Sequence, residues 1–323
     1  MKKKLVIGGI VLAMSVSSLT GCGLKTDTPL IGNIVGLKSD ELFQTKKIIC
    51  TKAEYMVEFI KVQEQLKKQM GEGLDWTATV DGQKTLETVA KEQARDSISV
   101  TYTLAALADD FEVSLTEREK DEAKESGKAE YEETDSKILQ YTGATQETYE
   151  KYYLNQKLSE KVRAKITANV GNDISDEQAR AIKIQYIHMS ASETNAKKIK
   201  ETLKEAKSIV KAGYQEFSRE AKQYTIEDSI EKIIYKNEAK EKYELKAYEL
   251  SNGEMSDIIQ DGSEYYLLYC VDSYMKNETE TNKQKLIAEK KERVLKEQYD
   301  TYRVDMDQDF NTKLWNDIKV FEN

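Results

Sequence analysis

Proline is almost missing from this chain of 323 residues, which contains one, Pro29, near its N-terminus. Because proline removes a backbone donor and breaks helix interiors, its scarcity leaves room for long uninterrupted helices. Charged residues make up 33% of the chain, and the mean hydropathy is −0.68. This composition predicts a well-solvated, mainly helical protein, and the length is enough for two modest domains.

Histidine and cysteine, which commonly bind zinc, are also few. The single histidine excludes a histidine-based zinc cluster, and Cys50 and Cys270 lack the paired spacing of metal ligands. The chain contains no glycine-rich phosphate loop, no Gly-x-Ser-x-Gly and no His-Glu-x-x-His. We therefore expect no cofactor and no metal. The net charge of −9 argues against a nucleic-acid partner, since such proteins need a basic face.

Two of the three cysteines, Cys50 and Cys270, stand in strand-like runs far apart in the chain. Two cysteines alone do not define a disulfide. We interpret both as buried free thiols, whose reactivity apolar burial suppresses, and a disulfide between them is the alternative.

The N-terminus has the pattern of a secretory signal. A basic start, Met1-Lys2-Lys3-Lys4, precedes an apolar stretch from Leu5 to Val16 that is too short for a comfortable membrane span. Leu19-Thr20-Gly21-Cys22 then resembles a bacterial lipobox. That resemblance implies a signal peptide over 1–21, lipidation of Cys22, a tether over 22–38 and a location on the extracytoplasmic face of the membrane. An ordinary signal with a nearby cysteine is the alternative.

Residues 39–175 read as a helical unit. A strand-like run over 41–51 precedes Thr51 and Glu54, whose spacing predicts a capping box and a helix to about Met70. Further helical patterns run over 86–109, 116–133 and 145–166. The helix over 116–133 has so little apolar content that it reads as a solvated arm, a partly mobile segment or a dimer arm.

Residues 176–275 follow a different order. An alternating strand, Ile182 to Met189, precedes an amphipathic helical segment that starts at Ala196 and ends near Gly213. The Tyr243–Ser256 run and a closing strand, Glu264 to Val271, complete the stretch. This order is typical of a small α+β domain.

With these residues, the stretch resembles the parvulin-type peptidyl-prolyl isomerase domain. Tyr243–Ser256 is similar to the family's short helix, Gly-Glu turn and serine before the last strand, and Ala212–Phe217 is similar to its Gly-x-x-Phe corner. With the anchor and helical flanks, the resemblance extends to extracytoplasmic foldases of the PrsA and SurA type. It implies an α+β fold: a mainly helical chaperone unit, an inserted parvulin-like domain and a C-terminal helix over 276–323 that packs back on the helical unit. Within that last segment, we interpret 276–283 as a linker and 285–315 as one long helix.

The resemblance also nominates site residues. The family's two strand histidines correspond to Tyr186 and Tyr266, its pocket phenylalanine to Tyr243, and its pocket methionine lies near Ala239. The family's glycine-rich loop is missing, since 226–235 contains no glycine. His188 lies two residues after Tyr186 and shares its strand face, so it joins the candidate set, although a lone strand histidine is more often a half-buried neighbour.

The predicted function is a membrane-anchored extracytoplasmic chaperone of the foldase type. Its partners would be unfolded or newly secreted polypeptides, and its parvulin-like isomerase would be weak or inactive because the pocket departs from the family pattern. The first alternative is an active prolyl isomerase with a pocket of Tyr186, His188, Tyr243 and Tyr266. A weaker alternative is a non-catalytic binding lipoprotein.

Overall fold

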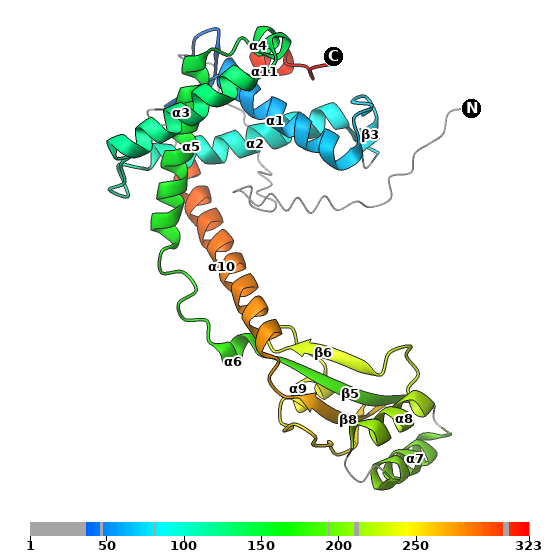
Figure 1. Cartoon of the computed structure of the whole chain (residues 1–323). Coiled ribbons are helices and arrows are strands. Elements are labelled where there is room, and N and C mark those ends of the chain that lie inside the picture. The colour runs from blue at the N-terminus through cyan, green and yellow to red at the C-terminus, as the bar shows by residue number, and fades with distance from the viewer. Residues whose placement is uncertain are drawn as a thin grey trace, which may run out of the picture. The chain divides into compact units, whose positions relative to one another are not determined.

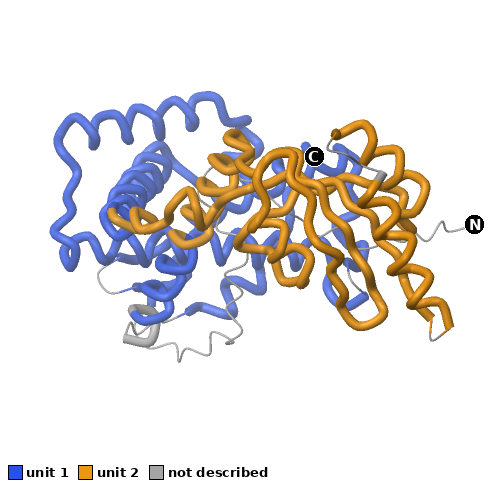
Figure 2. Tube along the Cα trace, turned by 90° about the horizontal axis from the view of Figure 1, so that it is seen from below, with its two compact units in different colours: residues 1–168, 292–323 blue, residues 169–291 orange. Residues whose placement is uncertain are grey.

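The computed structural model describes residues 37–45, 48–80, 82–192, 194–209, 213–305 and 310–322. The chain divides into two compact units: residues 1–168 with 292–323, called the helical unit, and residues 169–291, called the sheet unit (Figure 2). The predicted signal peptide, Cys22 and most of the predicted tether lie outside the described residues. Across the described ranges, every helix is too short or too polar to span a membrane.

The structure combines many helices with three small sheets, which confirms the predicted α+β class (Figure 1). The helical unit contains two antiparallel strand pairs and a set of packed helices. Its elements are β1 (Glu41–Thr45), β2 (Ile48–Thr51), α1 (Lys52–Met70), β3 (Thr79–Val80), β4 (Lys84–Thr85), α2 (Leu86–Ala106), α3 (Glu117–Glu133), α4 (Ser136–Thr142), α5 (Gln146–Thr167) and α11 (Thr312–Asn316).

Helix α1 begins where the sequence predicts it. The Thr51 amide donates to the Glu54 carboxylate at 2.7 Å, and the Glu54 amide donates to the Thr51 hydroxyl at 3.3 Å. This reciprocal pair satisfies two backbone donors that the first turn leaves open. The predicted capping box is confirmed, and it directs the apolar side of α1, including Tyr55 and Phe59, into the core of the helical unit.

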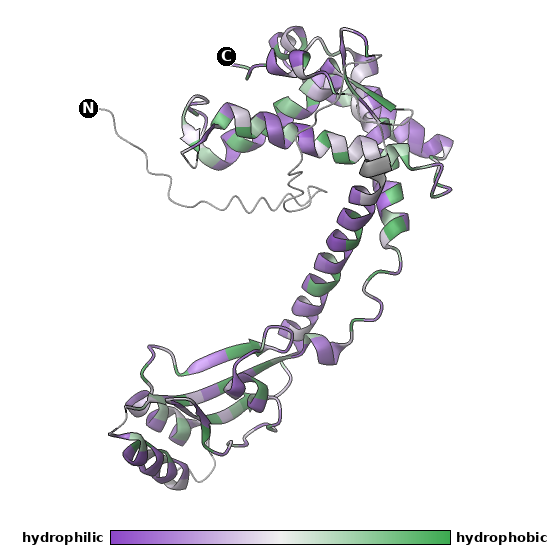
Figure 3. Cartoon of the chain, turned by 180° about the vertical axis from the view of Figure 1, so that it is seen from behind, coloured by the Kyte–Doolittle hydropathy of each residue, from purple (hydrophilic) through white to green (hydrophobic). Residues whose placement is uncertain are grey.

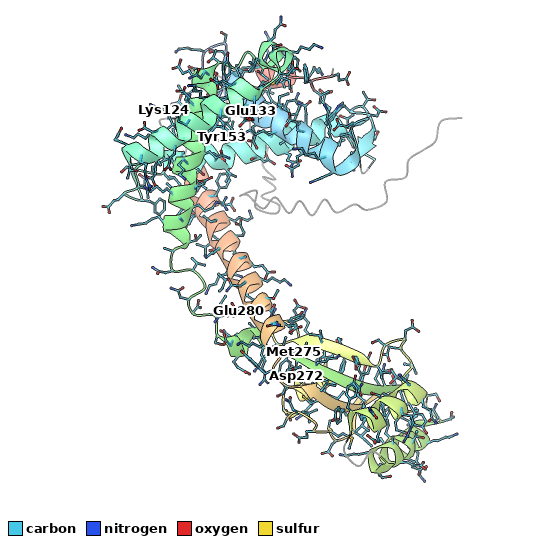
Figure 4. All side chains as sticks on the ribbon, in the orientation of Figure 1. Lys124, Glu133, Tyr153, Asp272, Met275 and Glu280 are labelled. Atoms are coloured by element: carbon cyan, nitrogen blue, oxygen red, sulfur yellow. The ribbon has the colours of Figure 1, made fainter. Side chains whose placement is uncertain are left out.

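The charged helix α3 packs on α5. At Gly127 the two backbones approach so closely that an added Cβ would lie 2.7 Å from the Glu150 Cα. The Tyr131 and Tyr149 rings meet edge to face at 5.9 Å. Tyr153 of α5, which is labelled in Figure 4, hydrogen-bonds Glu130 of α3. The low apolar content of α3 therefore reflects a contact made through glycine and polar groups.

The C-terminal residues pack on the first strands and helices of the helical unit. Phe310 forms a bridge with Phe43, and the Asn311 amide donates to the Leu42 carbonyl at 2.7 Å. Farther on, the Phe321 amide donates to the Gln63 side chain at 2.9 Å.

The sheet unit is built on a four-stranded antiparallel sheet in the order β6-β5-β8-β7. Helices α7 and α8 cover one face of this sheet, and the short α9 covers part of the other (Figure 1). Its elements are α6 (Asp176–Ala179), β5 (Ala181–Ser190), α7 (Ala196–Ile209), α8 (Tyr214–Tyr224), β6 (Glu231–Tyr235), α9 (Lys242–Ala247), β7 (Ile259–Asp261) and β8 (Glu264–Asp272).

Helix α10 (Lys276–Asp305) belongs to the sheet unit up to Lys291 and to the helical unit from Glu292. The predicted linker over 276–283 is wrong, because these residues form the first turns of α10. Their composition is mainly hydrophilic, which made them look like a linker (Figure 3). However, the segment has no glycine or proline to interrupt a helix. Two of its side chains also bond to the residues around the start of β5. Thr279 accepts from the Ala181 amide at 3.0 Å, and Asn282 donates to the Ala179 carbonyl at 2.9 Å.

The predicted single helix over 285–315 is also wrong at its end. Helix α10 ends at Asp305, and α11 is a separate helix capped by Asn311. Phe310 does not continue a helix because it pairs with Phe43 of β1. A distant strand thus overrides the local helical pattern at this point.

Candidate functional site

The four residues that the sequence nominates come together on the α9 face of the sheet. Strand β5 supplies Tyr186 and His188, which share a face because they are two residues apart. Strand β8 supplies Tyr266, and Tyr243 comes from α9. The Tyr186 and His188 side chains are largely buried, whereas Tyr243 and Tyr266 are half-buried.

Three of these rings form a continuous arrangement, which we call the aromatic stack: His188, Tyr266 and Tyr243. His188 and Tyr266 have ring centroids 4.2 Å apart and planes 7° apart. Tyr266 and Tyr243 have centroids 4.3 Å apart and planes 14° apart. Both faces of the Tyr266 ring are therefore covered, and Tyr186 lies beside the stack, 6.4 Å from Tyr243 between centroids.

The strand register decides which pairs meet. His188 is the direct partner of Tyr266 on β8, while Tyr186 is paired with Leu268. The resemblance had placed Tyr186 and Tyr266 at the positions of the family's two histidines. In this chain the imidazole, rather than the Tyr186 ring, lies against Tyr266.

Two carboxylates hold the imidazole. His188 Nδ1 contacts Glu227 Oε1, and Nε2 lies 2.8 Å from Glu264 Oε2. A carboxylate only accepts hydrogen bonds, so the doubly protonated imidazolium satisfies both contacts. Glu264 also accepts from the Ser263 and Ser190 hydroxyls, and these bonds, with that of His188, lower the pKa of the Glu264 carboxyl.

The other end of the stack is also held by charged groups. Lys232 Nζ lies 2.7 Å from the Tyr243 hydroxyl and 2.7 Å from Glu244 Oε1. Burial opposes the charge on Lys232, but the hydrogen bonds to Glu244 and Tyr243 outweigh it and raise the pKa of Lys232. Glu244 in turn accepts from the backbone amides of Lys240 and Glu241, which fixes the start of α9.

The tyrosine hydroxyls remain neutral near pH 7. Burial is the main cause that raises the pKa of Tyr266 to about 12, and Tyr243 and the Glu264 carboxylate add to it. Burial also raises the pKa values of Tyr186 and Tyr243. A neutral phenol donates a hydrogen bond but is a poor base, so the site offers ring faces and donors instead of proton abstraction.

Other chemistry is scarce around the site. In the part of the chain that the structure describes, no cluster of three or more His, Cys, Asp or Glu side chains is arranged to hold a metal ion. Cys50 and Cys270 are buried and unbridged, as expected, and they belong to different units. Burial raises the pKa of both thiols, that of Cys270 to about 11, so neither is a ready nucleophile.

The residues around the aromatic stack include an exposed apolar side chain. Ile226 is 61% exposed, and its amide donates to the His188 carbonyl at 3.2 Å. It therefore stands next to Glu227 at the edge of the site. A hollow of about 470 Å³ is lined by Lys242 and Lys246 of α9, by Glu249 after that helix, and by Ile259 of β7, the strand partner of Tyr266.

Four residues that shape the site were missed by the sequence reasoning: Glu227, Lys232, Glu244 and Glu264. Glu264 could have been found, since it precedes Tyr266 by two residues on a predicted strand and so shares its face. Glu227 lies in the irregular segment before β6, where no periodicity applies. Its position next to His188 depends on the path of that segment in three dimensions.

Several solved structures are similar to the chain. The peptidylprolyl isomerase PrsA of Bacillus anthracis is 17% identical, with 64% of this chain and 95% of that chain covered and a TM-score of 0.32. The foldase protein PrsA of Streptococcus pneumoniae is 16% identical, with 87% and 96% covered and a TM-score of 0.26.

A structure reported for SurA-like chaperones of Campylobacter jejuni is 12% identical, with 84% of this chain and 99% of that chain covered and a TM-score of 0.26. No protein-family model matches the chain, and no curated protein matches its sequence.

Proposed function

We propose that the protein is a membrane-anchored extracytoplasmic chaperone of the foldase type, which binds unfolded or newly secreted polypeptides. The observation that carries the proposal is the aromatic stack beside α9, in which Tyr243 and Tyr266 are only half-buried. Tyrosine rings offer broad amphipathic contact, and neutral phenols donate hydrogen bonds to a polypeptide backbone. Binding of this kind needs no covalent chemistry, and weak contacts allow the rapid exchange that a chaperone requires.

The geometry favours weak or absent prolyl isomerase activity. Accelerating rotation about an X–Pro bond requires a desolvated apolar site that stabilises a twisted amide, against a barrier of roughly 18–20 kcal/mol. Here both faces of the Tyr266 ring are already covered, and the Tyr243 hydroxyl accepts a hydrogen bond from Lys232. These contacts leave less ring surface for a proline side chain.

An active isomerase is the second candidate. It is supported by the gathering of Tyr186, His188, Tyr243 and Tyr266 on one sheet face, since those are the positions that the family resemblance nominates. In this case the Tyr266 ring would have to separate from one of its neighbours to admit proline.

One pair of assays separates the candidates. The protein would be residues 22–323 carrying Cys22→Ser, which keeps both compact units. Suppression of aggregation of a denatured client, without faster isomerisation of X–Pro peptides, supports the chaperone. Acceleration that Tyr266→Ala abolishes supports the isomerase. If neither effect is observed, the weaker alternative, a non-catalytic binding lipoprotein, is favoured.

The anchor is proposed from the N-terminal pattern and is tested separately. Cells expressing the full chain would be labelled with a palmitate analogue and fractionated. We expect label and membrane association in the natural chain and loss of both in Cys22→Ser. Label that persists in Cys22→Ser would overturn lipidation at this residue.

A further inference from the structure

We propose that the aromatic stack prefers client segments in which a lysine or arginine stands next to proline, and disfavours those with an acidic residue there. The inference rests on the proposed function, because it names the class of polypeptide that this site would bind. The exposed parts of Tyr243 and Tyr266, both half-buried, form the binding surface, and the charges around them decide which neighbours of proline are tolerated.

The charged groups come from every element packed around the stack. Glu227 precedes β6, Glu264 lies on β8, and Glu241 and Glu244 lie at the start of α9. Among the cations, Lys232 of β6 lies over the Tyr243 ring, and the His188 imidazole of β5 is itself part of the stack. Lys240 and Lys242 also lie at the start of α9, and Lys242 donates to the Gln260 carbonyl.

The pairing of these groups leaves net negative charge at Glu227 and Glu264. Lys232 is matched by Glu244 at 2.7 Å and so contributes little net field. His188 is shared between two carboxylates, of which one is therefore not neutralised. The side chains of Glu227 and Glu264 are 41% and 34% exposed, within reach of a bound peptide.

The pKa of Tyr266, at the centre of the stack, responds to the same carboxylates. Apart from burial, the leading influences on the Tyr266 phenol are Tyr243, Glu264, Glu227 and Glu241, and all of them raise its pKa. A lysine or arginine beside the stack would gain from the field of these carboxylates. A glutamate there would meet like charges.

The single histidine makes binding directly observable. His188 is the only imidazole in the chain, so in a protein without a histidine tag its ring-proton resonances need no further assignment. Because the ring lies against Tyr266, a peptide that reaches the stack will shift these resonances. The probes are three blocked peptides, acetyl-Ala-Lys-Pro-Phe-amide and its Glu-Pro and Ala-Pro counterparts, titrated into residues 22–323 carrying Cys22→Ser.

We expect the Lys-Pro peptide to bind roughly three- to fivefold more tightly than the Glu-Pro peptide at low salt, a ratio in the range of exposed ion pairs. The ratio should approach one in about 0.5 M salt, where screening is strong. Glu264→Gln, which keeps an amide oxygen for hydrogen bonding, should reduce the ratio at low salt. The matched control is Glu201→Gln, which removes one negative charge on α7, a helix on the opposite face of the sheet, and should leave the ratio unchanged.

The outcomes distinguish this inference from the proposed function. Equal affinities of the natural protein for the Lys-Pro and Glu-Pro peptides, or a preference for Glu-Pro, would overturn the inference and leave the stack as a client site. If none of the peptides shifts the His188 resonances, the stack is not a client site, and both fail. The peptide series on the natural protein decides the matter even if Glu264→Gln does not fold.

Discussion

His188 and Tyr266 face each other on neighbouring strands, with their ring centroids 4.2 Å apart and their planes within 7° of parallel. The imidazole is held at both nitrogens by Glu227 and Glu264, and Tyr266 is covered on its other face by Tyr243. The site is therefore a connected unit whose parts can be removed one at a time.

Removing the Tyr266 ring should destabilise the sheet unit. Tyr266→Leu loses two stacked contacts, each worth about 0.5–1.5 kcal/mol, so we expect a loss of roughly 1–3 kcal/mol in the free energy of unfolding. Tyr266→Phe keeps the ring and is the matched control. Unfolding in urea would be followed by the His188 ring-proton resonances, which report the sheet unit; the two tryptophans, Trp76 and Trp315, both lie in the helical unit and report that unit by fluorescence.

The same variants test the stack in the native state. The ring current of Tyr266 should displace the His188 resonances, and Tyr266→Leu should return them toward the position of an unstacked imidazole. Tyr266→Phe should leave them nearly in place. Identical resonances in Tyr266→Leu and the natural protein would show that the rings do not stack in solution.

Gly127→Ala should destabilise the helical unit. The added Cβ would lie 2.7 Å from the Glu150 Cα on α5, a backbone atom that cannot move aside cheaply. Overpacking costs about 1–3 kcal/mol, and the better helix propensity of alanine returns about 1 kcal/mol, which leaves a net loss of about 0–2 kcal/mol. Because the added Cβ would meet backbone atoms, we expect a loss in the upper part of that range, measured by tryptophan fluorescence in urea.

Gly73→Ala is the matched control for this contact, since a Cβ there meets nothing within 4 Å. It should change stability by no more than about 0.5 kcal/mol. Equal effects of the two substitutions would show that α3 does not pack on α5 at Gly127.

The sheet unit should lose stability in acid through Glu231. Hydrogen bonds from Lys183, Tyr214 and Gln185 lower the pKa of the Glu231 carboxyl to about 2, whereas an unfolded glutamate has a pKa of about 4.3. Because the folded value is the lower one, this carboxylate contributes stability that is fully present above about pH 4.3 and is lost as the pH falls toward 2. The amide resonances of β5 and β6 would follow unfolding across this interval.

Glu231→Gln should flatten the dependence of stability on pH between these two values. The control Glu201→Gln, at a side chain on α7 that is 64% exposed, should leave the slope as it is. A slope that is the same in Glu231→Gln and the natural protein would contradict the assignment to this carboxylate.

The two thiols should be protected by folding. In the Cys22→Ser form, Cys50 and Cys270 are the remaining cysteines, and both are buried with raised pKa values. We expect slow reaction with a disulfide reagent in the native protein and rapid reaction of both in urea. Rapid reaction of one thiol without urea would show that its unit opens locally.

Much of the helical framework follows from local rules that the sequence displays. Thr51, Thr116 and Thr145 each cap the helix predicted to start there, because a cap joins groups only two or three residues apart. The predictions of a linker over 276–283 and of a continuous helix through Phe310 failed for the opposite reason. Ala181 and Phe43, far away in the chain, decide where helix continues and where it stops.

The candidate site divides in the same way. Alternation along a strand places Tyr186 and His188 on one face, and this is visible in the sequence because it depends on neighbours two residues apart. The pairing of His188 with Tyr266 depends on strand register, and the carboxylate of Glu227 reaches the imidazole from a segment without periodicity. The sequence by itself thus determined the capped helix starts, the α+β class and the strand face that Tyr186 and His188 share. Tertiary structure alone decided which rings stack and which charges surround them, because those contacts join residues far apart in the chain.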